Sequence, residues 1–277
     1  MPYDHERDVA LAAALQAAHA IRRHAGQLSA RDVETKALHD LVTVADREAQ
    51  EVVLGALARA FPDDDLLGEE DADLARVDRS GRLWIVDPLD GTTNFLHGVP
   101  PYAVSIALRE DGRPVVGVVL EVTGGDAFCA TRGGGLTLNG KKVGVSATQT
   151  LDRALVATGF PFRDYRWAEG YLAAFDTVMR STRGIRRHGS AAMDLAWAAA
   201  GRFDAFFEVG LAPWDVAAGV LLVEEGGGRV TALPDGADPT FDGGLVASNG
   251  HLHADLRVAL EPLARAYAEA LDPARPV

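Results

Sequence analysis

Several acidic residues of this chain stand where an apolar segment ends or where a helix is expected to begin. They are Asp46, Glu69, Asp87, Asp90 and Asp215. Side chains at such positions can converge on one point even when they lie far apart in the sequence. Magnesium prefers oxygen ligands and is commonly held by a few carboxylates together with a substrate phosphate. The acidic residues therefore predict a magnesium site that can hold a phosphate.

The segment DPLDGTT, which begins at Asp87, carries the most information. A short apolar stretch ends at Asp87, and a proline restricts the backbone before Asp90, so both carboxylates can face one site. Gly91 permits close approach of the backbone. The amides of Gly91, Thr92 and Thr93, at an expected helix start, can meet a phosphate oxygen. Taken alone, however, Asp-Pro-x-Asp-Gly is more typical of a turn.

The charge of the chain limits its partners. Its 277 residues carry a formal net charge of −13. Proteins that bind a phosphate backbone usually have a basic face, so this charge argues against a nucleic-acid partner. An acidic protein can still hold a phosphate when divalent cations lie between its carboxylates and the substrate. The alternative is that the acidic surface only keeps the protein dispersed.

The composition favours a cytoplasmic protein. Apolar residues make up 48% of the chain, enough for a large core. The single cysteine, Cys129, cannot form an internal disulfide, and the sequence has no Cys/His zinc pattern. The N-terminus is polar and no run of 18 apolar residues occurs, so we expect neither a signal peptide nor a membrane partner.

Other candidate sites are weaker. The eight histidines show no metal-binding spacing. We interpret four of them as polar surface residues: His97, His188, His251 and His253. The glycines at 133–135 predict a hairpin turn and not a dinucleotide-binding loop. The basic cluster Arg186-Arg187-His188 can meet a phosphate, but a solvated turn beside a helix is the favoured interpretation.

Hydrophobic periodicity predicts the elements that position these residues. A helix is expected over 5–25. Its predicted inward face consists of Val9, Ala12, Leu15, Ala18 and Ile21. A second helix is expected over 44–60, and 83–86 is expected to form a strand that stops at Asp87. Residues 62–81 are interpreted as acidic and irregular.

The rest of the chain predicts two halves. Hairpins are expected for 102–109 with 114–121 and for 126–131 with 136–138. Later residues predict alternating strands and helices, with strands near 155–157, 203–208, 229–232 and 244–248 and helices over 171–179, 191–200 and from Trp214. We predict an N-terminal α+β half, 1–150, with most of the metal ligands. A C-terminal α/β half, 151–277, would carry Asp215 and substrate-selecting residues within the same compact unit.

Four motifs occur together in the chain. Residues 87–95 are DPLDGTTNF and residues 214–219 are WDVAAG. Upstream, Lys36 with DLVTVAD at 40–46 forms a third motif, and GEE at 68–70 forms a fourth. In this order and spacing, over roughly residues 10–255, the sequence resembles the inositol monophosphatase family. The resemblance implies an α+β fold, a layered α/β/α/β/α sandwich of the inositol monophosphatase and fructose-1,6-bisphosphatase type.

The resemblance implies a cofactor of two or three Mg²⁺ ions. One would be held by Glu69, Asp87 and the carbonyl of Leu89. A second would be held by Asp87, Asp90 and Asp215. A third, weaker ion would bind near Glu69 through water. The alternative for Glu69 is a solvated acidic loop.

The resemblance also implies a catalytic pair. Thr92 would hydrogen-bond Asp46, and the two would orient and help to activate a water molecule whose pKa the metal has lowered. Asp46 also has a structural interpretation, because Thr43-x-x-Asp46 matches a capping box at a helix start. Both roles can hold together.

The substrate residues that the resemblance implies come from both halves: Gly91, Thr92, Thr93, Gly189, Ser190, Ala191 and Glu208. Glu208 would accept hydrogen bonds from substrate hydroxyls, and the alternative is a strand-end carboxylate that faces solvent. Segments 157–162, 189–192 and 206–208 resemble bacterial inositol-1-monophosphatases. The implied reaction is hydrolysis of myo-inositol monophosphate, a small polyol monophosphate. A broader sugar or histidinol phosphate phosphatase is the alternative.

Further properties follow from the resemblance alone. The family commonly forms homodimers, and replacement of magnesium by small monovalent cations implies inhibition by lithium. Some bacterial members interact with the transcription or ribosome-assembly machinery. A regulatory binding module on RNA polymerase or the ribosome, with residual activity, is therefore an alternative from another functional class. The intact acidic residues argue against a purely structural role.

Overall fold

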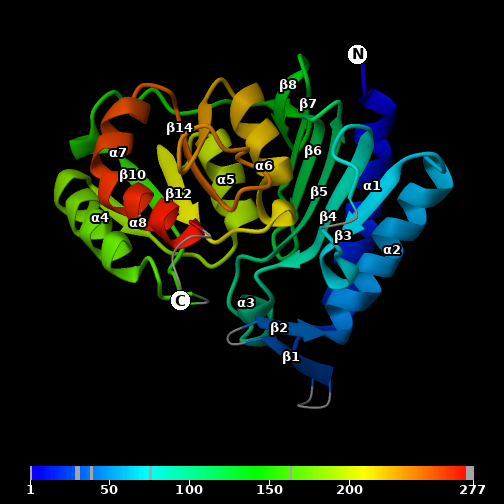
Figure 1. Cartoon of the computed structure of the whole chain (residues 1–277). Helices are drawn as coiled ribbons and strands as arrows, with labels where there is room; N and C mark the ends of the chain where they lie inside the picture. The colour runs from blue at the N-terminus through cyan, green and yellow to red at the C-terminus, as the bar shows by residue number, and fades with distance from the viewer. Residues whose placement is uncertain (1, 29–31, 38–39, 75–76, 163, 273–277) are drawn as a thin grey trace.

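The computed structural model describes residues 2–28, 32–37, 40–74, 77–162 and 164–272. These residues form an α/β/α/β/α sandwich, in which two sheets enclose a central helical layer and further helices cover the outer faces of the sheets (Figure 1). The predicted fold class is confirmed.

The larger sheet lies in the N-terminal half. It has seven strands in the order β3-β4-β5-β6-β7-β8-β9. They are β3 (Asp65–Gly68), β4 (Arg82–Asp90), β5 (Ala103–Glu110), β6 (Arg113–Glu121), β7 (Ala127–Thr131), β8 (Gly135–Leu138) and β9 (Lys141–Lys142). The outer face of this sheet packs against α1 (Asp4–His24) and α2 (Val44–Ala60). Both predicted helices and both predicted hairpins are therefore confirmed.

The smaller sheet lies in the C-terminal half and has five strands in the order β11-β10-β12-β14-β13. They are β10 (Leu155–Thr158), β11 (Gly184–Arg186), β12 (Ala205–Val209), β13 (Arg229–Ala232) and β14 (Gly244–Ser248). Its outer face is covered by α4 (Ala168–Ser181), α7 (His253–Ala259) and α8 (Glu261–Leu271). Short helical turns η2 (Glu69–Asp71), α3 (Thr92–Leu96) and η3 (Leu151–Arg153) connect other elements.

The central layer consists of α5 (Ala191–Ala199) and α6 (Pro213–Glu225), which carry much of the apolar core between the sheets. Glycines allow close packing here. A Cβ on Gly117 of β6 would lie 2.8 Å from the carbonyl oxygen of Ala218, and one on Gly219 would lie 2.5 Å from Leu195 Cδ1. The contact at Gly117 holds α6, and with it Asp215 in its first turn, close to the larger sheet, and the contact at Gly219 holds α6 close to α5.

Several elements differ from the predictions. The interval 62–81 contains the edge strand β3, which pairs in parallel with β4. β4 continues to Asp90 and does not stop at Asp87. The sequence analysis also did not predict the hairpin of β1 (Val33–Ala37) and β2 (Asp40–Thr43), nor the helices α7 and α8.

The predicted inward face of α1 is only partly correct, since Ala18 and Ile21 are buried but Ala12 and Leu15 are exposed. Leu15 is 50% exposed, and the buried side consists of Ala10, Ala13, Ala14, Ala17, Ala18, Ala20 and Ile21. A pattern of every third residue drifts around a helix that has 3.6 residues per turn. The small alanines let α1 lie close to α2 and to the sheet.

The surface prediction for His253 is also wrong. Its ring is buried, with Nδ1 3.0 Å from Ser248 Oγ and Nε2 2.9 Å from Thr231 Oγ1. Because a hydroxyl lies beside each ring nitrogen, the imidazole can be buried without an unsatisfied polar atom. The other three histidines are exposed or partly buried. In the ranges given above, no helix is long and apolar enough to cross a membrane.

Candidate active site

A β-bulge in β4 brings two of the predicted metal ligands to one side of the strand. Asp87 pairs with Ser105 of β5, and Asp90, three residues later, pairs with Ala103, which is only two residues away from Ser105. One extra residue is thus inserted in β4 between the two aspartates. Side chains three residues apart on a regular strand face opposite sides, so the bulge turns both carboxylates toward the same space.

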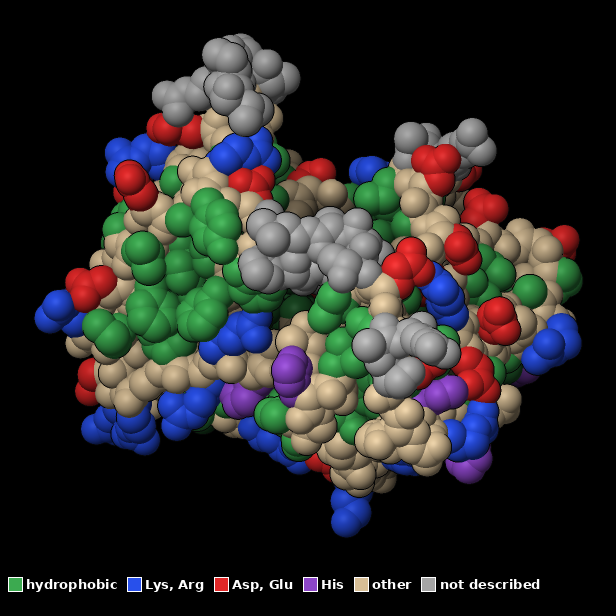
Figure 2. Space-filling view, turned by 90° about the horizontal axis from the view of Figure 1, so that it is seen from below, with side chains coloured by type: hydrophobic (Ala, Val, Ile, Leu, Met, Phe, Trp, Pro, Cys, Tyr) green, Lys and Arg blue, Asp and Glu red, His purple; other side chains and the backbone are tan. Residues whose placement is uncertain are grey.

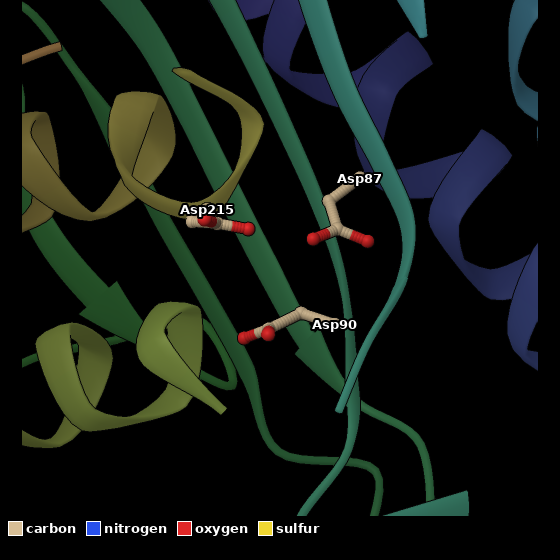
Figure 3. Close-up of side chains that lie close together, drawn as sticks. All are labelled: Asp87, Asp90 and Asp215. Carbon is tan, nitrogen blue, oxygen red and sulfur yellow. The ribbon is translucent and has the colours of Figure 1, made fainter. Parts of the chain in front are cut away.

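Asp215 approaches the same space from the first turn of α6, and Figure 3 shows the three carboxylates pointing toward one another. One oxygen from each of Asp87, Asp90 and Asp215 lies within 4.8 Å of the others. The backbone N–H of Ala212 donates to Asp215 Oδ2 at 2.7 Å, which fixes the orientation of this carboxylate. The cluster therefore joins the two halves of the chain.

Burial and mutual repulsion raise the pKa values of this cluster. Burial, and then the charges of Glu69, Asp90 and Asp215, hold the pKa of Asp87 well above its ordinary value. Burial and the charge of Asp215 raise the pKa of Asp90 to about 7, although Ser190 Oγ and the N–H of Ala192 donate to its Oδ2. Carboxylates held together in this way gain stability from a divalent cation between them.

Glu69 adds a fourth carboxylate. It begins η2 directly after β3, is partly buried and lines the same cavity as the cluster. It is therefore not part of a fully solvated loop. The available donors are all oxygen atoms, which is the donor set that magnesium prefers. The residues present fit a magnesium centre.

Asp46 makes the contacts that both of its interpretations require. Its Oδ2 accepts hydrogen bonds from the N–H and the hydroxyl of Thr43 at 2.9 and 2.5 Å, in a capping box at the start of α2. Its Oδ1 accepts from Thr92 Oγ1 at 2.9 Å. Burial raises the pKa of Asp46, and these hydrogen bonds oppose the rise. Thr92 Oγ1 also lies 3.1 Å from the carbonyl oxygen of Leu89, so the pair adjoins a predicted metal ligand.

Gly91 is required between β4 and α3. Its φ is +92°, in the left-handed region, and a Cβ there would lie 3.2 Å from the Pro101 carbonyl oxygen and 3.3 Å from that of Gly189. Asn94, which the sequence analysis did not single out, donates from Nδ2 to the carbonyls of Pro101 and His188 at 2.8 and 2.7 Å. The Gly91 loop is thereby tied to the C-terminal half.

The predicted site residues gather in one cavity of about 780 Å³. Those that line it are Glu69, Asp87, Leu89, Asp90, Gly91, Thr92, Thr93, Gly189, Ser190, Ala191, Glu208 and Asp215. Asp46 lies behind Thr92. The hydroxyl of Ser190 donates to Asp90 at 2.6 Å and also accepts from the N–H of Met193 at the start of α5, so its hydrogen bonds are made within the protein.

Glu208 lies within β12 and lines the same cavity as the carboxylate cluster. A Cβ on Gly159 would stand only 1.8 Å from Glu208 Oε1, so the carboxyl group lies directly against the backbone of Gly159. Burial, and then the charges of Asp194 and Asp215, hold the pKa of Glu208 well above its ordinary value. Its carboxyl group is available to a ligand in the cavity.

Two more charged residues belong to this wall: Asp194, which the sequence analysis did not single out, and Arg187, for which it favoured a solvated turn over a phosphate contact. Asp194 is buried and lines the cavity. Its Oδ1 lies 2.9 Å from His188 Nδ1, and the two atoms share a hydrogen bond. Arg187 also lines the cavity, with its guanidinium 5.0 Å from the Phe162 ring centre. The prediction of a solvated turn for this basic cluster is partly correct: Arg186 belongs to β11, but Arg186 and Arg187 are exposed, and Arg187 and His188 lie in the connection to α5. The position of this cluster just before Gly189, a predicted substrate residue, was the sequence signal that could have placed it at the site.

Comparison with known proteins agrees with this geometry. The sequence matches the inositol monophosphatase family over residues 3–268. It is 42% identical over 261 residues to the Nus factor SuhB of Pseudomonas aeruginosa, a match that covers 92% of this chain and 95% of the relative. It is 41% identical over 254 residues to an inositol-1-monophosphatase of Rhizobium meliloti, again covering 92% and 95%.

A solved structure gives the same result. The extragenic suppressor protein suhB of Bartonella henselae superposes with a TM-score of 0.86 at 40% identity, covering 92% of this chain and 97% of that one. The shared fold, the four motifs and the carboxylate cluster agree with one another. The chain belongs to the inositol monophosphatase family.

Proposed function

We propose that this chain is a Mg²⁺-dependent phosphomonoesterase that hydrolyses myo-inositol monophosphate to inositol and phosphate. The observation that carries the proposal is the convergence of Asp87, Asp90 and Asp215 in a cavity that Glu69 also lines. A relative that is 41% identical bears the name inositol-1-monophosphatase, which supports the substrate class. We also propose a cytoplasmic location.

The carboxylates would hold two magnesium ions. Glu69, Asp87 and the carbonyl of Leu89 would bind one, and Asp87, Asp90 and Asp215 would bind the other. A third, weaker ion would bind near Glu69 through water. Magnesium supplies a Lewis acid that stabilises the charge of the phosphoryl group and lowers the pKa of a water molecule.

The chain's own residues orient the reactants. When Thr92 donates its hydroxyl proton to Asp46, the lone pairs of Thr92 Oγ1 can accept a hydrogen bond from the attacking water. Asp46 is buried, which favours its taking up a proton. The amides of Gly91, Thr92 and Thr93 would hold the phosphate oxygens while the ester oxygen leaves on the opposite side.

Phosphate release from a panel of monophosphates at saturating Mg²⁺ tests this function. We expect the highest kcat/KM for myo-inositol monophosphate, complete loss with a chelator, and uncompetitive inhibition by lithium at about millimolar concentration. Higher kcat/KM for sugar or histidinol phosphates would favour the broader phosphatase. Activity without any divalent cation would contradict the proposed metal dependence.

A second candidate function has support from a name. The relative from P. aeruginosa, 42% identical, is called a Nus factor, which favours the alternative of a regulatory binding module for the transcription machinery. The complete carboxylate cluster favours the enzyme. If no member of the monophosphate panel released phosphate at saturating Mg²⁺, the binding module would become the better proposal.

Replacing Glu208 by glutamine should change substrate preference. Cations held by Asp90 and Asp215 would remove the repulsion that these charges exert on the carboxylate of Glu208 and so favour its ionised form. As a charged acceptor it can contribute about 1.5–3 kcal/mol for each hydrogen bond to a substrate hydroxyl. We therefore expect Glu208→Gln to lower kcat/KM for myo-inositol monophosphate by about tenfold or more. Hydrolysis of p-nitrophenyl phosphate, which lacks those hydroxyls, should hardly change. Equal losses on both substrates would show that Glu208 supports the metal site or the fold instead.

The protein should be a homodimer in solution. This proposal rests mainly on the family, and an exposed apolar surface on α4 supports it. Leu172 and Met179 of this helix are 63% and 49% exposed, and Figure 2 shows hydrophobic side chains gathered on the side where α4 lies. Light scattering at micromolar concentration should give twice the mass of 29.4 kDa. A monomer mass would contradict the prediction.

A further inference from the structure

Glu69 lies on a turn that has little support of its own. β3 ends at Gly68, and Glu69 is the first of only three residues in η2. A turn this short makes few internal hydrogen bonds, so contacts with neighbouring elements must fix its orientation. Since Glu69 is the first residue of the turn, those contacts also set the direction of its carboxylate.

One side chain of α2 makes two such contacts. Gln50 is 4% exposed, and its Oε1 accepts a hydrogen bond from the N–H of Glu70 at 2.9 Å. Its Nε2 donates to Asp71 Oδ2, also at 2.9 Å. The backbone N–H requires an acceptor and the carboxylate requires a donor, so this pairing fixes which end of the amide faces which group.

The packing around Gln50 leaves little room for another arrangement. A Cβ on Gly68 would lie 2.4 Å from Gln50 Oε1. The φ of Gly68 is −104°, which any residue can adopt, so space and not backbone conformation requires glycine here. The amide of Gln50 therefore lies directly against the residue that precedes Glu69.

One face of α2 contacts two parts of the site, Thr92 and the turn that carries Glu69. Asp46 and Gln50 are four residues apart on α2, and residues at this spacing share one face of a helix. Asp46 accepts a hydrogen bond from Thr92, which follows β4. Gln50 binds the turn that follows β3, the strand beside β4. The helix thus contacts both Thr92 and the turn that carries Glu69.

We infer that Gln50 is a positioning residue that holds Glu69 in the orientation needed to bind the metal. The inference rests on the proposed metal-dependent function. Groups that orient a metal ligand from outside the coordination sphere typically change metal affinity by about 10- to 100-fold when removed. Here the amide of Gln50 holds the backbone N–H of Glu70 and the carboxylate of Asp71, the two residues that follow Glu69.

Direct measurement of Mg²⁺ binding to the whole protein by titration calorimetry tests this role. Gln50→Met keeps the length of the side chain and removes both hydrogen bonds. We expect its Kd for Mg²⁺ to rise about tenfold or more, and the Mg²⁺ concentration for half-maximal activity to rise with it. Gln16→Met, the same substitution at an exposed position of α1, should leave both values unchanged.

Exchanging the donor and the acceptor between Gln50 and Asp71 separates a positioning role from a general loss of stability. Gln50→Glu keeps an acceptor for the N–H of Glu70 but places a second carboxylate against Asp71, so it should weaken Mg²⁺ binding. Gln50→Glu combined with Asp71→Asn restores a donor and an acceptor with reversed polarity and the original net charge. We expect this double variant to recover most of the Mg²⁺ affinity.

The outcomes distinguish this inference from the proposed function. Wild-type protein that binds no Mg²⁺ would overturn both. Wild-type binding with an unchanged Kd in Gln50→Met would overturn only the inference. If Gln50→Met did not fold, judged by circular dichroism, equal Kd values for Gln50→Glu and the double variant would overturn it in the same way.

Discussion

Replacing Asp87 by asparagine should lower kcat/KM for myo-inositol monophosphate by about a thousandfold, which is about 4 kcal/mol of transition-state stabilisation. Asp87 is buried beside Asp90 and Asp215, and the charge of Glu69 also acts on it, so in the proposed function its carboxylate would serve both ions. Asparagine offers one oxygen, and its NH₂ group repels a cation. Phosphate release at saturating Mg²⁺ measures the effect.

Loss of folding should not account for this result. Asp87 Oδ1 accepts a hydrogen bond from the N–H of Leu89 at 3.0 Å, and the side-chain oxygen of asparagine can accept the same bond. We therefore expect Asp87→Asn to retain the wild-type circular dichroism spectrum while its affinity for Mg²⁺ falls. Asp63→Asn, at an exposed position, provides a control with the same change of charge. Full activity in Asp87→Asn would refute its assignment as a metal ligand.

The sequence predicted elements well where the local signals agreed. α2 spans 44–60 as expected, because Thr43 and Asp46 form a capping box at its start and Phe61 follows its end. β14 was also predicted within its observed bounds. β3 was missed because it is a four-residue edge strand whose apolar pair Leu66-Leu67 follows three aspartates, 63–65. Its partner strand β4, and not its own composition, makes it a strand.

The site was predictable as a set of residues but not as a geometry. The spacing of Asp87 and Asp90 suited a turn as well as a metal site, and only the pairing of β4 with β5 reveals the bulge that turns both to one side. Gln50 carries no signal in the sequence, because its partners Glu70 and Asp71 lie about twenty residues later in the chain. Contacts of this kind depend on how strands and helices pack.

The metal-free protein should lose stability as the pH rises. Asp90 has a pKa of about 7 in the folded chain, compared with 3.8 for an ordinary aspartate, and the pKa of Asp87 is also raised well above its ordinary value. Between pH 3.8 and about pH 7, folded Asp90 binds more protons than unfolded Asp90, so the free energy of unfolding falls as pH increases. The loss should begin near the unfolded pKa and be complete above the folded pKa.

The expected size of this effect is large. The rise of the Asp90 pKa from 3.8 to about 7 alone corresponds to about 4 kcal/mol. Burial lowers the pKa of His253 to about 4, which acts in the opposite direction below about pH 6.5, so the wild type alone does not isolate the contribution of the cluster. Comparison of the wild type with Asp90→Asn isolates the contribution of the cluster, because both proteins contain His253.

Thermal unfolding between about pH 5 and pH 8 in a chelator, and again in saturating Mg²⁺, measures the effect. In the chelator, the wild type should unfold at a lower temperature at pH 8 than at pH 6, and Asp90→Asn should show a flatter dependence and a higher melting temperature at pH 8. Magnesium should stabilise the wild type most at pH 8, where the carboxylates are ionised, and should stabilise Asp90→Asn much less. If the two metal-free proteins showed the same pH dependence, burial and mutual repulsion of the carboxylates would not explain the proposed requirement of this site for a cation.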